Sequence, residues 1–432
     1  MTYHRVETRM RRMNPATTNT ALGASQDSRW TPKLKTRIQL HQRLPREIVN
    51  SKHIQVDCYG PDEFDVIPWP DTEQADFARR YFKPFYERGT KDLISNVDTD
   101  VHIAIVEGIV VPYTVGSRGK NNSYVCAPQS HYVDYACEEL RHFKGSFLYY
   151  LALIIFPILR FFCNFCQFNK VVMVNNWLLS TNLYPDISLE QIKALADSLK
   201  SRYPKYAIVF RSIDLGLREH LYRVLEEHGS RMVFSRRVHI VHRDNKKVWK
   251  RSDIKRDNRL FKKSPYVLVS GEDLEEDDFE RLADLYKQLY IGKYSHLNPQ
   301  FTAEFMRHKW KDDLWEFSAY RSDGTFDAVV GTIHINGVGT APVIGYEFDR
   351  PRESGLYRFA YLEMLKVAQR RDETMHCSAG VAHYKQLRGA ESYLEYNAVF
   401  DSHLPPQRKL PWWVFQQLSD KVIVPKMIKE NL

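Results

Sequence analysis

Strands and helices alternate twice along this chain, and that alternation constrains the fold more than any other feature. In the first series, strands are predicted at 171–174, 206–210 and 231–241, with helices at 188–202 and 217–228 between them. β-Branched runs predict the strands, and apolar residues at helical spacing predict the helices. The chain is therefore expected to be an α/β (α+β) protein, with a mixed central sheet flanked by helices.

A second series with the same order occupies the C-terminal half. Apolar spacing from Leu274 to Leu289 predicts a helix, and Asn336-Gly337 is a strong signal for a hairpin turn. Strands are predicted at 315–321, 327–335, 342–348, 375–378 and 393–400, and helices at 356–370 and 382–388. Upstream, 101–111 predicts one or two strands and 129–143 a helix. Because the residues of the two series do not align, a structural duplication is a hypothesis based on element order alone.

Length and composition bound the domain organisation. At about 150 residues per domain, a chain of 432 residues is expected to form two to three domains. Its composition, with 43% hydrophobic and 27% charged residues, is that of a globular protein and excludes bulk disorder. Residues 1–45 lack periodicity and are expected to form a disordered basic tail, with a transit peptide as the alternative. We expect an N-terminal lobe at 46–250 and a C-terminal lobe at 251–432.

The net charge of +9 suits an anionic partner, which can be a nucleic acid, a phosphorylated cofactor or an anionic membrane. Residues 231–263 hold thirteen Arg and Lys against three Asp, and Glu272–Glu280 holds seven acids in nine residues. The basic stretch is either a solvated junction or the lining of a groove for phosphates. The acidic stretch is typical of the first turn of a helix.

The most apolar stretch, 147–168, has the length of a membrane span. Pro157 and Arg160 lie inside it and polar residues end it, which argues against a span. We expect a helix buried between two half-domains. The alternatives are a helix lying in a membrane interface and, last, a true span.

Several chemistries leave no signature in this sequence. Six cysteines are too few for a disulfide scaffold, and the first 40 residues lack an apolar signal-peptide core, so a cytoplasmic location is expected. Walker, Rossmann and Gly-x-Ser-x-Gly motifs are absent. Cys163 and Cys166 have metal-pair spacing without a second pair, so we expect buried thiols and no metal.

The densest cluster of polar residues at predicted element ends lies between 345 and 403. Within it, Tyr346 to Arg358 predicts the end of a strand, a loop with Gly355 and the start of a helix. Backbone N–H groups at such a start attract anions, and Arg352 would add a charge-assisted contact. This arrangement suits a pyrophosphate; the alternative is a plain turn with solvated arginines.

With these residues, the segment from about 272 to 405 resembles the GNAT superfamily of acyl-CoA N-acyltransferases. The stretch 378–389, followed by Leu394-Glu395-Tyr396, resembles the divergent two-lobed branch that includes the Fem-type aminoacyltransferases. The resemblance implies two GNAT-like lobes around a mixed sheet. This chain departs from the phosphate-loop pattern at Tyr357, where the superfamily has a small residue.

The resemblance implies transfer of an acyl group from acyl-CoA to an amine of a small-molecule or amino-acid-like acceptor, in a biosynthetic reaction. Glu347 is the expected general base and Glu395 the second candidate, and Tyr396 or Tyr346 would protonate the leaving thiolate. The residues expected to bind the cofactor are Arg352, Gly355, Arg358, Lys385 and Arg388. Asn175, Asn176 and Asn182 would shape the acceptor pocket or cap the next helix.

Three other functions stay open, the third of which is a nucleic-acid-binding module. One is a Fem-type transferase that uses aminoacyl-tRNA, in which 231–263 would contact the RNA backbone. The second is a non-catalytic protein bound to an anionic membrane surface through the basic tail and 147–168. The sequence carries no DNA-binding motif, so a DNA partner is not expected.

Overall fold

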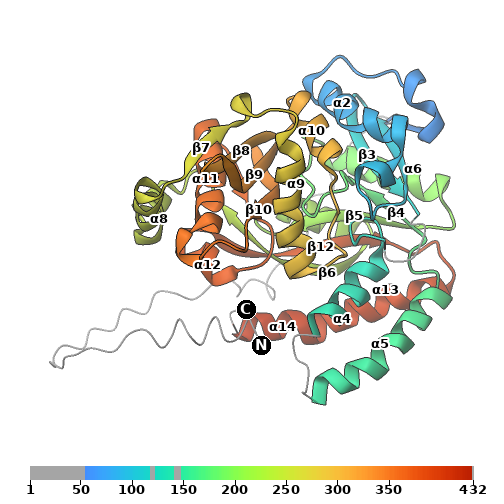
Figure 1. Cartoon of the computed structure of the whole chain (residues 1–432). Helices are drawn as coiled ribbons and strands as arrows, with labels where there is room; N and C mark the ends of the chain where they lie inside the picture. The colour runs from blue at the N-terminus through green and yellow to red at the C-terminus, as the bar shows by residue number, and fades with distance from the viewer. Residues whose placement is uncertain (1–53, 117–121, 141–146, 431–432) are drawn as a thin grey trace, which may run out of the picture. The chain divides into compact units, whose positions relative to one another are not determined.

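One mixed sheet runs through both halves of the chain (Figure 1). The structure, a computed structural model, describes residues 54–116, 122–140 and 147–430, so the predicted tail at 1–45 lies outside it. Twelve strands of the described residues form the sheet. The first six are β1 (Val56–Tyr59), β2 (Asp100–Val106), β3 (Ile109–Val115), β4 (Val171–Val174), β5 (Ala207–Asp214) and β6 (Arg231–Val241). The second six are β7 (Val267–Ser270), β8 (Glu316–Ser322), β9 (Thr325–Ile335), β10 (Val338–Tyr346), β11 (Thr374–His376) and β12 (Glu391–Phe400).

The strand order confirms the structural duplication. It runs β1-β2-β3-β4-β5-β12-β6-β11-β10-β9-β8-β7. In each half an antiparallel series ends in a parallel pair joined by a helix: β4 and β5 through α6 (Leu189–Arg202), and β10 and β11 through α11 (Leu356–Arg371). The last strand of each half lies beside the fifth strand of the other half. The order is therefore unchanged when the halves are exchanged and the sheet is read from its other edge.

In both parallel pairs one strand is longer than its partner. β10 pairs with β11 only from Val338 to Thr340, although β10 continues to Tyr346. β4 ends at Val174, whereas β5 continues to Asp214.

The predicted elements of both series are present, with boundaries shifted by a few residues. The segment predicted as one or two strands at 101–111 is the hairpin of β2 and β3. The helices that the prediction also located include α4 (Tyr135–Leu140), α7 (Glu219–Glu227), α9 (Asp278–Lys287) and α12 (Ala382–Leu387). The helices that it missed include α2 (Glu73–Arg88), α8 (Ser252–Lys263), α10 (Ala303–Lys311), α13 (Pro406–Leu418) and α14 (Val424–Glu430).

Helices cover both faces of the sheet. In the first half, α6 and α7 pack on one face, and α5 (Phe147–Phe165) and α13 pack on the other, around Phe168, Met173 and Trp412. In the second half, α8 and α11 cover one face. The largest core cluster joins α2, α9 and α10 to strands of both halves. The single sheet contains strands from both sides of residue 250, where the sequence predicts a boundary between two lobes. That boundary stays a prediction.

The expectation that 147–168 is buried between two half-domains is wrong. Ala152 and Phe156 on α5 face the core, but Ile154 and Ile158 are 65% and 63% exposed. Apolar composition alone does not distinguish a helix covered on two sides from one covered on a single side. No helix in the described part of the chain is long and apolar enough to cross a membrane.

Candidate functional site

The candidate site lies at the centre of the sheet, where β12 runs between β5 and β6, and two β-bulges build it. In the first bulge, Arg211 and Ser212 of β5 both lie opposite the single residue Asn397 of β12. A regular strand would send neighbouring side chains to opposite faces, whereas a bulge redirects one of them. Arg211 and Ser212 consequently line the same pocket.

The second bulge inserts Ser235 of β6 beside the Glu395–Arg236 pair. Arg236 donates from Nε to Glu395 Oε1 at 2.8 Å and from a terminal nitrogen to Oε2 at 3.1 Å. Ser235 Oγ donates to Oε1 at 3.2 Å. Since Glu395 is only 2% exposed, this is a buried carboxylate held by a bidentate guanidinium.

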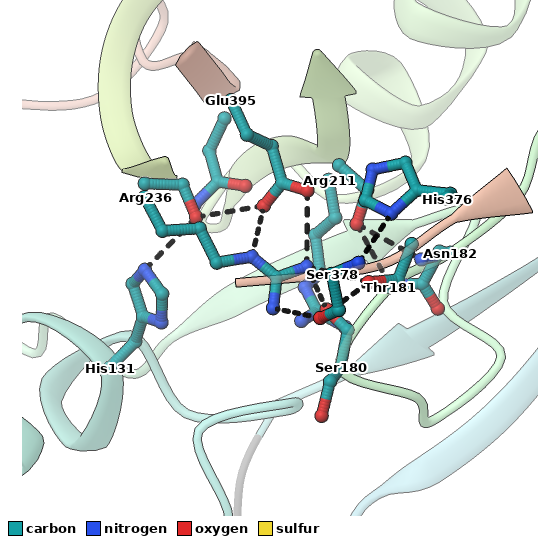
Figure 2. Close-up of polar contacts among 12 residues, drawn as sticks. His131, Ser180, Thr181, Asn182, Arg211, Arg236, His376, Ser378 and Glu395 are labelled. Atoms are coloured by element: carbon teal, nitrogen blue, oxygen red, sulfur yellow. Dashed lines mark hydrogen bonds and ion pairs between the residues drawn. The ribbon is translucent and has the colours of Figure 1, made fainter. Parts of the chain in front are cut away.

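Arg236 also connects three segments that are distant in sequence (Figure 2). Besides Glu395 on β12, it donates to Ser180 O at 2.7 Å and Thr181 Oγ1 at 2.9 Å in the loop after β4. It donates to Ser378 Oγ, after β11, at 3.2 Å. The polar centre is thus shared by both halves of the duplicated sheet.

Arg211 is a second buried guanidinium in the same pocket. It donates to Asn176 Oδ1 at 2.8 Å and Leu179 O at 3.3 Å, and no carboxylate of the described residues pairs with it. Burial and the positive charge of Arg236 lower the pKa of Arg211. Two cations against one carboxylate leave the pocket electropositive, which favours an anionic or oxyanionic group.

His131 closes one side of the pocket from a π-helix, Ser130–Asp134. Its Nε2 lies 3.2 Å from Ser235 Oγ, so His131, Ser235 and Glu395 form a hydrogen-bonded chain. Burial, together with the two nearby arginines, lowers the pKa of His131 to about 3. The imidazole is therefore neutral at physiological pH.

Left-handed backbone conformations gather at this site. Ser212 and Ser378, whose side chains take part in it, have φ values of 58° and 57°. The bulky residues Leu178 and Val381, in the loops after β4 and β11, have φ values of 59° and 43°. Such conformations cost about 1–3 kcal/mol each and concentrate at functional sites.

The predicted asparagines hold the loop after β4. Asn175 accepts a hydrogen bond from the indole of Trp177, and Asn182 accepts one from the Trp177 backbone N–H. Asn176 orients Arg211. Two of these asparagines contact residues of the pocket, Asn176 through Arg211 and Asn182 through Ser212. None of the three caps the next helix, α6, because its N-cap residue is Ser188.

The pocket is narrow. It encloses about 10 Å³, room for about one water molecule. Its wall includes Tyr124, Tyr132 and Trp412 besides the charged residues. Entry of the reacting end of a substrate therefore requires movement of these side chains.

Glu347 and Tyr346, predicted as catalytic residues, lie at the end of β10 and have other partners. Glu347 accepts hydrogen bonds from Arg281 at 2.8 Å and from the Asp349 backbone at 3.0 Å. Partial burial raises its pKa, but these hydrogen bonds outweigh that effect and lower the pKa to about 2. The Tyr346 hydroxyl accepts from Lys293 at 3.2 Å.

Glu395 and Tyr396 point to opposite faces of β12, so they do not act on one group together. Glu395 lines the central pocket, whereas Tyr396 packs against Tyr222 and Phe234 in the core beneath α7. Of the four predicted catalytic residues, the structure places only Glu395 in the pocket.

Arg358 and Arg388, predicted to bind the cofactor, share the fully buried carboxylate of Asp257. Each donates from Nε to one Asp257 oxygen at 2.6 Å. Lys385 donates to the carbonyls of Cys377 and Ala379, and burial lowers its pKa to about 8.

At the predicted phosphate loop, Arg352 is exposed and Gly355 has a φ of 76°. A Cβ at Gly355 would collide with Leu260 of α8, which covers this helix start. Tyr357 packs against Tyr384, filling space between the loop and α12.

Sequence reasoning missed Arg211, Ser235 and His131. Arg236 fell inside the basic stretch and Ser378 inside the GNAT-like stretch, so those two could have been found.

Cys163 and Cys166 are buried free thiols, as predicted. No metal-binding group of three His, Cys, Asp or Glu residues occurs within the described ranges.

Comparison with known proteins supports the resemblance. Residues 250–393 match the acetyltransferase (GNAT) domain family. A comparison with curated proteins gives no match. Residues 250–393 therefore form a GNAT acetyltransferase domain, the type of domain that the resemblance implies.

Three solved structures are similar over much of their length. The C-terminal domain of a protein named as a lysylphosphatidylglycerol synthetase, from Agrobacterium fabrum, is 11% identical with a TM-score of 0.45, covering 84% of this chain and 98% of that one. A tandem GNAT protein from the clavulanic acid biosynthesis pathway is 8% identical with a TM-score of 0.38, covering 81% and 99%. FemX is 10% identical with a TM-score of 0.42, covering 53% and 80%.

Proposed function

We propose that this acyltransferase moves an acyl group onto an amine in the central pocket, with Glu395 as the general base. The observation that carries this proposal is the convergence of Glu395, Arg236 and Arg211 on one narrow pocket through two β-bulges. Glu347, the base expected from the sequence, lies at the end of β10 and is not among the residues that line this pocket. A general base must reach the proton that it removes, and of the two predicted glutamates Glu395 is the one that lines the pocket.

In the proposed step, the amine nitrogen attacks the acyl carbonyl while its proton moves to Glu395. The C–N bond forms, and the carbonyl oxygen becomes an oxyanion that Arg211 stabilises. Collapse of this intermediate breaks the bond to the carrier, and the leaving group takes a proton. Tyr124, whose hydroxyl lies 2.5 Å from Ser180 Oγ in the pocket wall, replaces Tyr346 and Tyr396 as the proton donor.

We propose acyl-CoA as the donor, as the superfamily implies, bound through the exposed Arg352 at the start of α11. Arg358, Lys385 and Arg388 have internal partners and would support this region rather than contact phosphate. The acceptor is a small-molecule amine, and the protein acts in the cytoplasm or at a membrane surface.

A second donor, an aminoacyl-tRNA, is favoured by the cationic surface of α8 and the segment before it. Ten basic residues there face solvent, namely Arg243, Lys246, Lys247, Lys250, Arg251, Lys255, Arg256, Arg259, Lys262 and Lys263. A polyanion bound to this surface would release counterions, so its affinity would fall steeply with salt.

Native mass spectrometry of freshly purified protein with a panel of acyl-CoAs tests the donor class. Retention of one acyl-CoA, with little dependence on salt, supports the first donor. Binding of aminoacyl-tRNA that weakens steeply with salt, without retention of any acyl-CoA, would replace it with the second.

A further inference from the structure

One face of α5 is a continuous apolar stripe open to solvent. The exposed residues recur at helical spacing along four turns; they are Tyr150, Leu153, Ile154, Ile155, Ile158, Phe161 and Phe165, each between 46% and 73% exposed. The opposite face, with Ala152, Phe156 and Cys163, is buried in the core. This helix is therefore apolar on both sides, unlike a surface helix whose outer side faces only water.

A second helical segment continues this surface. Residues 406–430 form α13, a π-helical turn and α14, and they expose Leu410, Trp413, Leu418, Val422, Ile423 and Ile428 by 41–55%. α13 and α5 share one core cluster, and the Gln407 side chain donates to the carbonyl of Phe165 at 3.0 Å. Figure 1 shows α5 and α13 along the same side of the sheet, and α14 follows α13, with Val424 and Met427 packed against the core cluster of α6 and α7. We call the exposed apolar residues of these helices the apolar platform.

The charges on the apolar platform are mostly positive. α5 contains no acidic residue, and its one charge, Arg160, pairs with Asp134. Residues 406–430 hold five basic and two acidic residues, and Lys421, Lys426 and Lys429 are exposed. Exposed aliphatic and aromatic side chains bordered by lysines are typical of helices that lie in the interface of an anionic membrane.

The apolar platform adjoins the candidate active site. Trp412 forms part of the pocket wall, and its neighbour Trp413 is 47% exposed on the apolar platform. The pocket residues Met173 and Val209 belong to the core cluster that α5 and α13 cover. A surface bound to the apolar platform would therefore lie against the same face of the sheet as the pocket.

From these observations we propose that α5 and residues 406–430 dock this protein on the surface of an anionic lipid bilayer. The exposed apolar side chains enter the headgroup region, while Lys421, Lys426 and Lys429 contact lipid phosphates. Docking stands independently of the proposed reaction; if both hold, the pocket works within reach of the bilayer surface.

Vesicle flotation of the full chain tests this docking. The probe is phosphatidylcholine vesicles containing about one third phosphatidylglycerol, with pure phosphatidylcholine for comparison. We expect the wild type to float with the anionic vesicles, and Ile154→Glu/Ile158→Glu to bind at least about tenfold more weakly. Both isoleucines are exposed, so the variant should keep the wild-type Tm.

Matched variants separate the apolar platform from other surfaces. Val66→Glu/Val267→Glu changes two exposed apolar residues elsewhere, 71% and 62% exposed, and should bind like the wild type. Replacing Lys421, Lys426 and Lys429 by Gln should weaken binding to anionic vesicles. The same change at the exposed lysines Lys247, Lys255 and Lys262 should not.

Three results would overturn the proposal. They are absence of wild-type flotation, equal flotation of the isoleucine variant, and loss of flotation only in the variant of the Lys247 group. If light scattering shows a dimer that the isoleucine variant dissociates, while no vesicles float, the apolar platform is instead an interface between two copies of this chain.

Discussion

Removing the charge of Glu395 should destabilise the protein through its pair with Arg236. The carboxylate is 2% exposed and the Arg236 side chain 17%, with Nε and Oε1 2.8 Å apart. Two charges with centres about 4 Å apart interact by about 4 kcal/mol at an effective dielectric constant of about 20. Glu395→Gln keeps the shape but leaves Arg236 and Arg211 without a counter-charge. Breaking such a pair costs about 3–5 kcal/mol, so we expect a loss of about 3 kcal/mol in the free energy of unfolding.

A double-mutant cycle of Glu395→Gln and Arg236→Gln, followed by urea denaturation at low salt, measures this coupling. We expect about 2–3 kcal/mol for the pair. The control is the exposed pair of Lys246 and Asp372, whose side chains are 73% and 69% exposed and whose coupling should stay below about 1 kcal/mol. Equal coupling in the two cycles would refute the inference that the central pair is desolvated.

Three further predictions concern other parts of the fold. Burial raises the pKa of Asp214 from 3.8 to about 6, so ionisation of this carboxyl group destabilises the folded protein as the pH rises through that interval. Asp214→Asn should therefore become more stable than the wild type as the pH rises, by up to about 3 kcal/mol at pH 7. Urea denaturation at several pH values measures this difference, and a difference that does not change with pH would contradict the prediction. Asp257→Asn leaves two buried arginines short of charge and should cost about 3–5 kcal/mol, measurable as a lower Tm. Arg352→Ala should weaken acetyl-CoA binding measured by calorimetry, and equal affinities would show that this loop does not bind the donor.

Much of the fold could be predicted from the sequence because the signals are local. β6 was predicted at its observed bounds, 231–241, and α11 within one residue. The Asn336-Gly337 turn follows from the left-handed φ values that both residues adopt, 51° and 70°. The exchange of β6 and β12 between halves could not be predicted, since pairing between distant strands leaves no mark on either strand alone.

The candidate site was harder to predict because it depends on bulges. Strict alternation along β5 would direct Arg211 and Ser212 to opposite faces, and nothing local announces the extra residue. Arg358 and Arg388 resembled ligand-binding residues, but the acid that neutralises them, Asp257, lies more than a hundred residues away. Charge alone therefore did not separate a phosphate contact from an internal ion pair.

Single-turnover acyl transfer by Glu395→Gln and Glu347→Gln, compared side by side with the donor that the protein retains, tests the central claim most directly. Loss of a general base lowers the rate by about 10²-fold or more. The account predicts such a loss for Glu395→Gln and a rate within about threefold of the wild type for Glu347→Gln. A near-normal rate for Glu395→Gln, with the loss confined to Glu347→Gln, would contradict it and place the chemistry at the end of β10.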